Sequence, residues 1–226
     1  MAAHNSILTR IKDLLGDDVT DITGYKDLIN AGFNYVVDLI PNNSELWRSS
    51  NLSSVASVSS NSYQYKVVIV TRTDSGDSVE RICKEVPLDY LRRGEDSSSI
   101  YYNAGNYKNP IFSFTANGEI IIRPTGGTVA IYKFDYFDSG DDVIDSTSLS
   151  EAFGFPEQAE YLGVLKACTN LLNGKMSDAV HDDEDQELAN LLNGQLAIVD
   201  KSMQEEMQRL GLPHQLVGDG KDEEFK

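Results

Sequence analysis

The sequence predicts an α+β protein in which a helical bundle, built from the N- and C-terminal helices, carries an inserted antiparallel β-rich segment. Apolar residues recur every three or four positions in residues 4–40 and again in residues 156–210, which is the helical period. Between them, in residues 60–140, apolar and polar residues alternate as they do in half-buried strands. We therefore expect both ends of the chain to share one helical core around the β-rich insertion.

Two amphipathic helices are predicted at the start of the chain. Residues 4–16 place apolar side chains on one face and end at Gly16, and residues 24–40 repeat the pattern and end before Pro41. Residues 49–62 then contain eight serines in fourteen positions and have little to bury, so we predict a flexible connector there. With the connector, residues 1–59 form the first part of the helical domain.

Two β-hairpins are predicted in the middle of the chain. The first joins residues 63–73, in which Val67 and Val70 belong to opposite faces, to residues 78–86. The second centres on Asn117-Gly118, a dipeptide that readily takes both positive-φ positions of a tight turn. Residues 129–137 add a strand, for at least five in all. The turn-rich residues 87–110 are predicted to form a long loop with a helical turn at 87–92.

A pair of long helices is predicted in residues 141–210. Pro156 restarts the helical period, and apolar residues at steps of three and four continue to residue 176 and again from 189 to 210. Two helices of comparable length separated by a polar break indicate an antiparallel pair. Residues 211–226 are rich in glycine and charge, so we expect a flexible tail that is ordered only by a partner.

The charge is strongly acidic and unevenly distributed. The net charge is −17, and residues 141–226, with 19 acids against 6 bases, hold most of it. Such a surface repels phosphate backbones, which argues against ordinary nucleic-acid binding. The longest nearly apolar run is too short and too polar to cross a bilayer, and the first residues lack the pattern of a secretory signal. Two cysteines rule out a disulfide framework, which favours intracellular synthesis.

No catalytic, cofactor-binding or metal site is predicted. The most acidic stretch includes Asp182, Asp183, Glu184 and Asp185, and it falls where the last long helix begins. Acids there complement the helix dipole, whereas a calcium loop would need ligands at alternate positions and a glycine at the sixth. The three histidines have no metal-ligand spacing, and residues 173–178 lack the partner residues of a phosphate loop.

Five residues are predicted to contact other proteins. Tyr101, Tyr102 and Tyr107 lie in a long loop, where tyrosines could stack on sugars or bases but more often anchor protein interfaces. Leu212 and Phe225 are the large apolar residues near the two ends of the C-terminal tail. We interpret all five as interface candidates.

The order of elements resembles that of the head-to-tail connector (adaptor) proteins of tailed bacteriophages, as does the helix opening Pro-x-x-x-x-Tyr-Leu within "FPEQAEYLGVLKACTNLL". The resemblance implies a structural virion protein, made in the host cytoplasm and placed in the neck. It implies a homo-oligomeric ring, typically of twelve copies, between the portal protein and the tail or neck proteins. Genomic DNA would pass through without specific binding, and Asp182, Asp183, Glu184 and Asp185 are candidates for the channel wall.

Two other classes of function are compatible with the sequence. One is a phage tail or baseplate attachment module, or a receptor-binding module, that uses the tyrosine-rich loop. The other is a hydrolase with scattered carboxylates, which the lack of a placed acid–base pair disfavours. The size of the protein in solution and the nature of its bound partner would separate these functions from a ring-forming connector.

Overall fold

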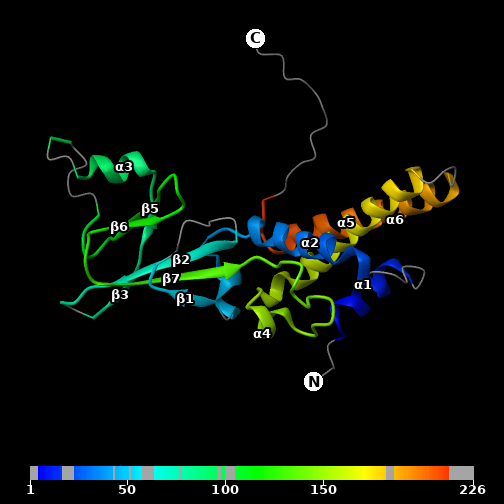
Figure 1. The fold of residues 1–226 in the computed structure, drawn as a ribbon, viewed down its shortest axis with the longest axis horizontal. Coiled ribbons are helices and arrows are strands. Elements are labelled where there is room, and N and C mark those ends of the chain that lie inside the picture. The colour runs from blue at the N-terminus through cyan, green and yellow to red at the C-terminus, as the bar shows by residue number, and fades with distance from the viewer. Residues whose placement is uncertain are drawn as a thin grey trace, which may run out of the picture. The chain divides into compact units, whose positions relative to one another are not determined.

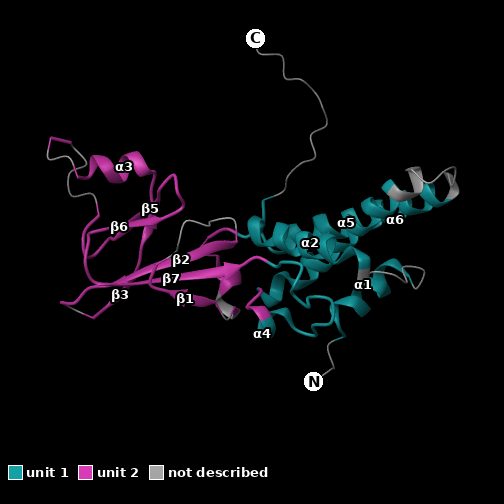
Figure 2. Ribbon diagram, in the orientation of Figure 1, with its two compact units in different colours: residues 1–40, 137–152, 156–226 teal, residues 41–136, 153–155 magenta. Residues whose placement is uncertain are grey.

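The predicted α+β class is confirmed by a computed structural model, which has helices at both ends of the chain and strands between them (Figure 1). The structure describes residues 5–16, 23–42, 44–50, 52–57, 64–76, 78–95, 98–99, 105–181 and 186–213. The chain divides into two compact units (Figure 2). Unit 1 comprises residues 1–40, 137–152 and 156–226, and unit 2 comprises residues 41–136 and 153–155. Unit 2 begins at Pro41, whereas the sequence placed the start of the β-rich insertion at residue 60.

Unit 1 is helical. Its elements are α1 (Ile7–Leu15), η1 (Thr23–Tyr25), α2 (Lys26–Leu39), α4 (Leu149–Phe153, of which the last residue belongs to unit 2), η3 (Glu157–Ala159), α5 (Glu160–His181) and α6 (Gln186–Arg209). The Ser6 side chain caps α1 by accepting a hydrogen bond from the Thr9 backbone N–H, and Gly16, at φ 83°, ends the helix. The four helices that the sequence predicts are present. α1 and α2 are each a few residues shorter than the predicted ranges 4–16 and 24–40.

Helices α2 and α5 approach closely because glycines lie between them. A Cβ atom on Gly32 would lie 2.7 Å from the backbone N and 2.8 Å from the Cα of Ala167, and one on Gly163 would overlap the Phe33 ring. Around this crossing the apolar face of α2 is fully buried, with Ile29, Phe33, Val36 and Val37 in the core. Both glycines lie inside helices, where glycine costs stability, so their role is to allow the close packing.

Polar contacts fix the returning chain on unit 1. The Asn34 side chain exchanges two hydrogen bonds of 2.9 Å with the backbone of Phe137, where the chain re-enters the unit. The buried Glu160 carboxylate forms an ion pair with Arg10 of α1 and accepts a hydrogen bond of 3.1 Å from the Leu149 backbone N–H. These contacts join α1, α2, α4 and α5 through segments that are far apart in sequence.

Helix α6 packs on α5 and ends in a Schellman motif. The Thr169 hydroxyl on α5 lies 3.2 Å from the Asp200 carboxylate on α6. At the end of α6 the Leu212 N–H bonds to the Met207 carbonyl and the Gly211 N–H to the Gln208 carbonyl, with Gly211 at φ 66°. Helix α6 therefore has a defined end, after which the described part of the chain stops at Pro213.

The described part of unit 2 contains two sheets. Sheet A has the order β1 (Ser53–Val55), β7 (Thr128–Asp135), β2 (Tyr65–Thr73), β3 (Glu80–Ile82), with every pair antiparallel. Sheet B has the order β4 (Lys84–Glu85), β5 (Ile111–Phe114), β6 (Ile120–Arg123), with β4 parallel and β6 antiparallel to β5. The unit also holds η2 (Glu45–Ser49) and α3 (Leu88–Arg93), which packs on β5. One face of each sheet contributes to a shared core of Val67, Val70, Cys83, Phe112 and Ile131.

The β-bulge in strand β2 corrects the predicted assignment of faces. The register of β2 against β7 shifts between Val67 and Ile69, so one extra residue is inserted at Val68. Val67 and Val70, which simple alternation places on opposite faces, therefore enter the same core. The bulge makes β2 apolar on both sides for part of its length, since Val68 is also buried.

Two turn and loop predictions are corrected as well. The serine-rich stretch 49–62 is not a connector throughout, because Ser53, Ser54 and Val55 form β1 and pair with β7; residues 58–63 lie outside the described part. Gly118 has φ 78° but Asn117 does not have positive φ. The Gly118 N–H bonds to the Thr115 carbonyl and the Thr115 N–H to the Glu119 carbonyl, which is the longer hairpin turn closed by one left-handed glycine.

Candidate functional site

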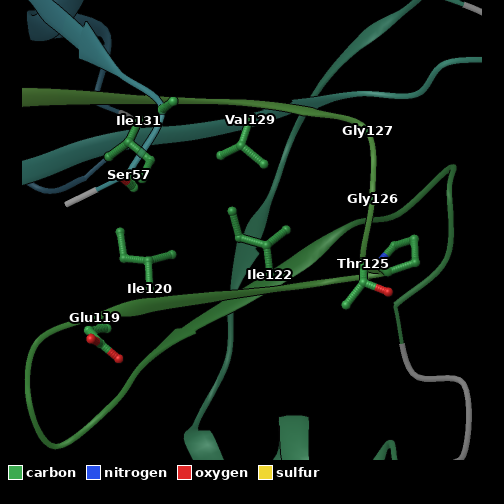
Figure 3. A pocket seen from close by; sticks show the side chains of 11 residues that line it. Ser57, Glu119, Ile120, Ile122, Thr125, Gly126, Gly127, Val129 and Ile131 are labelled. Carbon is green, nitrogen blue, oxygen red and sulfur yellow. The ribbon is translucent and has the colours of Figure 1, made fainter. Parts of the chain in front are cut away.

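A cavity of unit 2 lies between the two sheets (Figure 3). Its volume is about 520 Å³. Ile120 and Ile122 of β6 point into it from one side, and Val129 and Ile131 of β7 point into it from the other (Figure 3). Ala56 and Ser57, just after β1, and Glu119 complete its rim together with the turn at residues 124–127. Isoleucine and valine side chains line its walls, whereas Ser57, Glu119, Thr125 and the glycine backbone add polar groups, so its surface is at least as polar as it is apolar.

The cavity exists because β6 and β7 are consecutive strands that do not pair. The segment Pro124-Thr125-Gly126-Gly127 separates them, and both glycines have positive φ. Side chains are poorly tolerated at Gly127 in particular, because a Cβ atom there would lie 2.5 Å from the Thr73 carbonyl oxygen. The chain therefore crosses from sheet B to sheet A, and the side chains of β6 and β7 face each other.

A buried arginine fixes this turn. The Arg72 side chain is 2% exposed, donates a hydrogen bond of 2.9 Å from Nε to the Gly126 carbonyl and forms an ion pair with Asp74. Its guanidinium also lies 5.4 Å from the centre of the Tyr107 ring, within the range of a cation–π contact. Arg72 therefore connects β2, the 124–127 turn and the loop that carries Tyr107.

The structure describes one of the three predicted interface tyrosines. Tyr107 is 59% exposed, so it presents most of its ring to solvent while one face meets Arg72. Tyr101 and Tyr102 lie outside the described residues, and whether the three gather on one surface stays a prediction.

The other predicted site residues fall mainly in or beside parts of the chain that are not described. Asp182, Asp183, Glu184 and Asp185 lie between the end of α5 and the start of α6, outside the described residues, as does Phe225. Leu212 is buried, with its N–H closing the Schellman motif of α6. Leu212 is thus largely covered by its own chain, and its role in docking a partner stays a prediction.

Within the described part of the chain, no group of three or more His, Cys, Asp and Glu side chains could hold a metal ion. Both cysteines are buried and are not joined in a disulfide. Burial raises the pKa of the Cys83 thiol to about 11 and that of Cys168 to about 12, and the nearby Arg72 only partly opposes the shift at Cys83. Both thiols are therefore protonated at neutral pH, which is the unreactive form.

The thiol pKa values predict a stability change at alkaline pH. An unfolded thiol releases its proton near pH 9, whereas the folded Cys168 keeps its proton until about pH 12. The unfolded state then binds fewer protons, so stability should be unaffected below pH 9 and fall from there toward pH 12. Urea unfolding of the natural chain and of Cys168→Ala at several pH values would measure this. Above pH 9 the free energy of unfolding should fall less steeply with pH in the variant than in the natural chain. Equal slopes would contradict a buried, protonated Cys168.

Large apolar side chains are also exposed on both units. On α6 they include Leu191 at 60% and Ile198 at 69% exposure, and at β3 they include Val79 at 49% and Ile82 at 60%. The sequence analysis identified neither these positions nor the cavity. The residue type alone does not show whether an isoleucine in a strand is buried in the core or exposed to solvent. The one available signal was the Gly-Gly turn, which separates β6 from β7.

None of the described helices is both long enough and apolar enough to cross a membrane. No protein-family model and no curated protein matches the chain.

Proposed function

We propose that the chain is a structural protein of a tailed-phage neck, in which copies form an adaptor ring between the portal and the tail. The observation that carries this proposal is the composition of the two units. Both ends of the chain build the helical unit, and the β-rich unit is made from the middle. This is the element order on which the resemblance to head-to-tail connectors rests.

The chemistry of the described residues supports a structural role. The two thiols are buried, and the ion pairs join elements of the fold rather than converge on one open site. A net charge of −17 also suits a conduit, because DNA that adsorbs to lysine and arginine would move slowly. The partners in this proposal are copies of the same chain, a portal protein, tail or neck proteins, and DNA that passes without specific binding.

Electron microscopy and mass photometry of the purified protein would test the proposal. We expect closed rings, of about twelve copies by the family likeness, and labelled antibodies should decorate the neck of intact virions. Location at a fibre tip or on the capsid exterior would overturn it.

A tail deletion tests the docking role of the C-terminal residues. It should begin after Pro213, because Gly211 and Leu212 cap α6 and Leu212 is buried. Removal of residues 214–226 should leave the melting temperature and ring size unchanged but weaken binding to portal particles. Particles that assemble complete, infectious necks without these residues would remove the docking role.

A second candidate, an attachment module, is favoured by the exposure of Tyr107. Tyr107→Ala should then abolish adsorption to host cells while necks assemble normally. Under the adaptor proposal, virions that carry this variant should adsorb as before.

A further inference from the structure

Two strand edges of unit 2 carry isoleucine and are unpaired on one side among the described residues. Each sheet ends in strands with a single neighbour, which are β1 and β3 in sheet A and β4 and β6 in sheet B. β1 is short and mostly serine, and β4 is the dipeptide Lys84-Glu85, so both edges are polar as protected edges usually are. β6 differs, because it carries Ile120, Ile121 and Ile122, and β3 carries Ile82 beside the charged Glu80 and Arg81.

The open edge of β3 is formed by Glu80 and Ile82. In an antiparallel pair, hydrogen-bonded residues alternate with residues whose N–H and C=O point away from the partner. The Cys83 N–H bonds to the Val70 carbonyl, so Cys83 and Arg81 bond to β2, and the backbone groups of Glu80 and Ile82 point outward. The Ile82 side chain is 60% exposed at this edge.

The open edge of β6 is formed by Ile120 and Ile122. The Thr115 N–H bonds to the Glu119 carbonyl, so Glu119, Ile121 and Arg123 bond to β5, and the backbone groups of Ile120 and Ile122 point outward. The side chains of Ile120 and Ile122 also line the cavity between the sheets (Figure 3). This edge thus combines unused backbone groups with a recess that Ile120 and Ile122 line, the two requirements for binding an added strand.

The two edges lie on opposite sides of unit 2. The cavity is lined by β6, by β7 and by the residues after β1. β6 therefore faces the half of sheet A that contains β1 and β7. β3 ends the other side of sheet A. A contact between β3 of one copy and β6 of another therefore uses two different surfaces and leaves one of each open for the next copy, as a ring requires.

We propose that β3 of each copy adds to the β6 edge of its neighbour as an antiparallel strand, joining sheet A of one subunit to sheet B of the next. In this register Ile82 lies opposite Ile120 and Glu80 opposite Ile122, so the two outward residues of each strand exchange hydrogen bonds. Ile82 meets Ile120 beside the cavity instead of water. The inference rests on the proposed ring and specifies the contact that holds its β units together.

A second copy explains both edges at once. An exposed isoleucine on an edge strand promotes association. The same chain presents this isoleucine, Ile82, on the open edge of β3 and a second open edge, that of β6, where Ile120 and Ile122 can meet it. An unrelated extended peptide would account for the β6 edge but would leave Ile82 of β3 exposed.

Substitutions at Ile82 test the role of β3. Ile82→Asp adds a charge at an exposed position, and Ile82→Pro removes an N–H that bonds to nothing within the described chain, so both variants should fold. We expect each to convert rings into single chains of 25.0 kDa in mass photometry, with unchanged circular dichroism. The matched control is Ile198→Asp on α6, which is 69% exposed and should leave the rings intact.

Cross-linking between copies tests the pairing of the strands. Chains with Ile82→Cys and chains with Ile120→Cys are mixed and oxidised with copper phenanthroline; the native thiols, with pKa values of about 11 and 12, should not react at neutral pH. We expect a disulfide dimer in the mixture and little in either chain alone. Ile82→Cys mixed with Ser54→Cys, on the β1 edge, is the control and should give none.

The outcomes separate this inference from the proposed function. Rings that persist in both Ile82 variants, or a cross-link to Ser54→Cys instead of Ile120→Cys, overturn the β3–β6 contact and leave the adaptor proposal standing. A natural chain that stays at 25.0 kDa and gives no cross-link overturns the contact too, and its place in the virion then decides the function.

Discussion

Replacing Gly32 with alanine should lower the free energy of unfolding by about 1–3 kcal/mol, the usual cost of overpacking a core. The new Cβ would lie 2.7 Å from the backbone N of Ala167, so no side chain can rotate away to relieve the overlap. Helices α2 and α5 would have to separate, which loosens the packing of the buried face of α2. Urea unfolding followed by circular dichroism at 222 nm would measure the loss.

The matched control is Gly194→Ala in α6. Gly194 is also inside a long helix, but a Cβ atom there would meet nothing within 4 Å. Alanine should therefore stabilise the helix by up to about 1 kcal/mol through its higher helix propensity. Opposite signs at the two glycines are the expected result. If Gly32→Ala is neutral or stabilising, the close approach of α2 and α5 is not as tight as described.

Replacing Arg72 with methionine should destabilise unit 2 by about 3 kcal/mol, the lower end of the cost of removing one partner of a buried ion pair. Methionine keeps much of the apolar stem of Arg72 but leaves the Gly126 carbonyl without its donor and the Asp74 carboxylate without its ion-pair partner. The turn at residues 124–127 then loses its attachment to β2. Arg72→Lys should not restore stability, because a single ammonium cannot reproduce the planar guanidinium contacts.

Arg123→Met is the control for Arg72→Met. Arg123 also forms an ion pair in unit 2, but its partner Glu95 is 48% exposed, so the change should cost less than about 1 kcal/mol. Trp47, the only tryptophan, is buried in unit 2 with its ring centre 5.8 Å from that of Phe134, and its fluorescence reports unfolding of this unit. Equal losses in the two variants would show that the burial of Arg72 adds nothing.

The helical half of the fold could be predicted from sequence because its signals are local. Apolar residues of α2 repeat with the helical period, and Gly16 and Pro41 mark helix ends by their own backbone preferences. The hairpins β2–β3 and β5–β6 were also predicted, since each joins neighbouring segments around a turn. These elements depend on residues within a few positions of one another.

The parts that the sequence did not predict depend on distant partners. β1 exists only because β7, more than seventy residues later, supplies its hydrogen bonds, so its serines gave no strand signal. The bulge at Val68 is a feature of the pairing with β7 and not of the β2 sequence alone. The cavity and the contact of Arg72 with Tyr107 likewise require the two sheets to be placed first.

The insertion of unit 2 between the helices of unit 1 determines when the protein can fold during synthesis. α1 and α2 are made first, but α5, which covers the apolar face of α2, is complete only at His181. At a synthesis rate of about 5–20 residues per second, the roughly 140 intervening residues take on the order of 7–30 s. Unit 2 can be synthesised in that time. Ile29, Phe33 and Val36, which are buried in the folded protein, stay exposed until α5 has been made. The nascent chain is therefore most prone to aggregation, and most dependent on chaperones, before α5 leaves the ribosome.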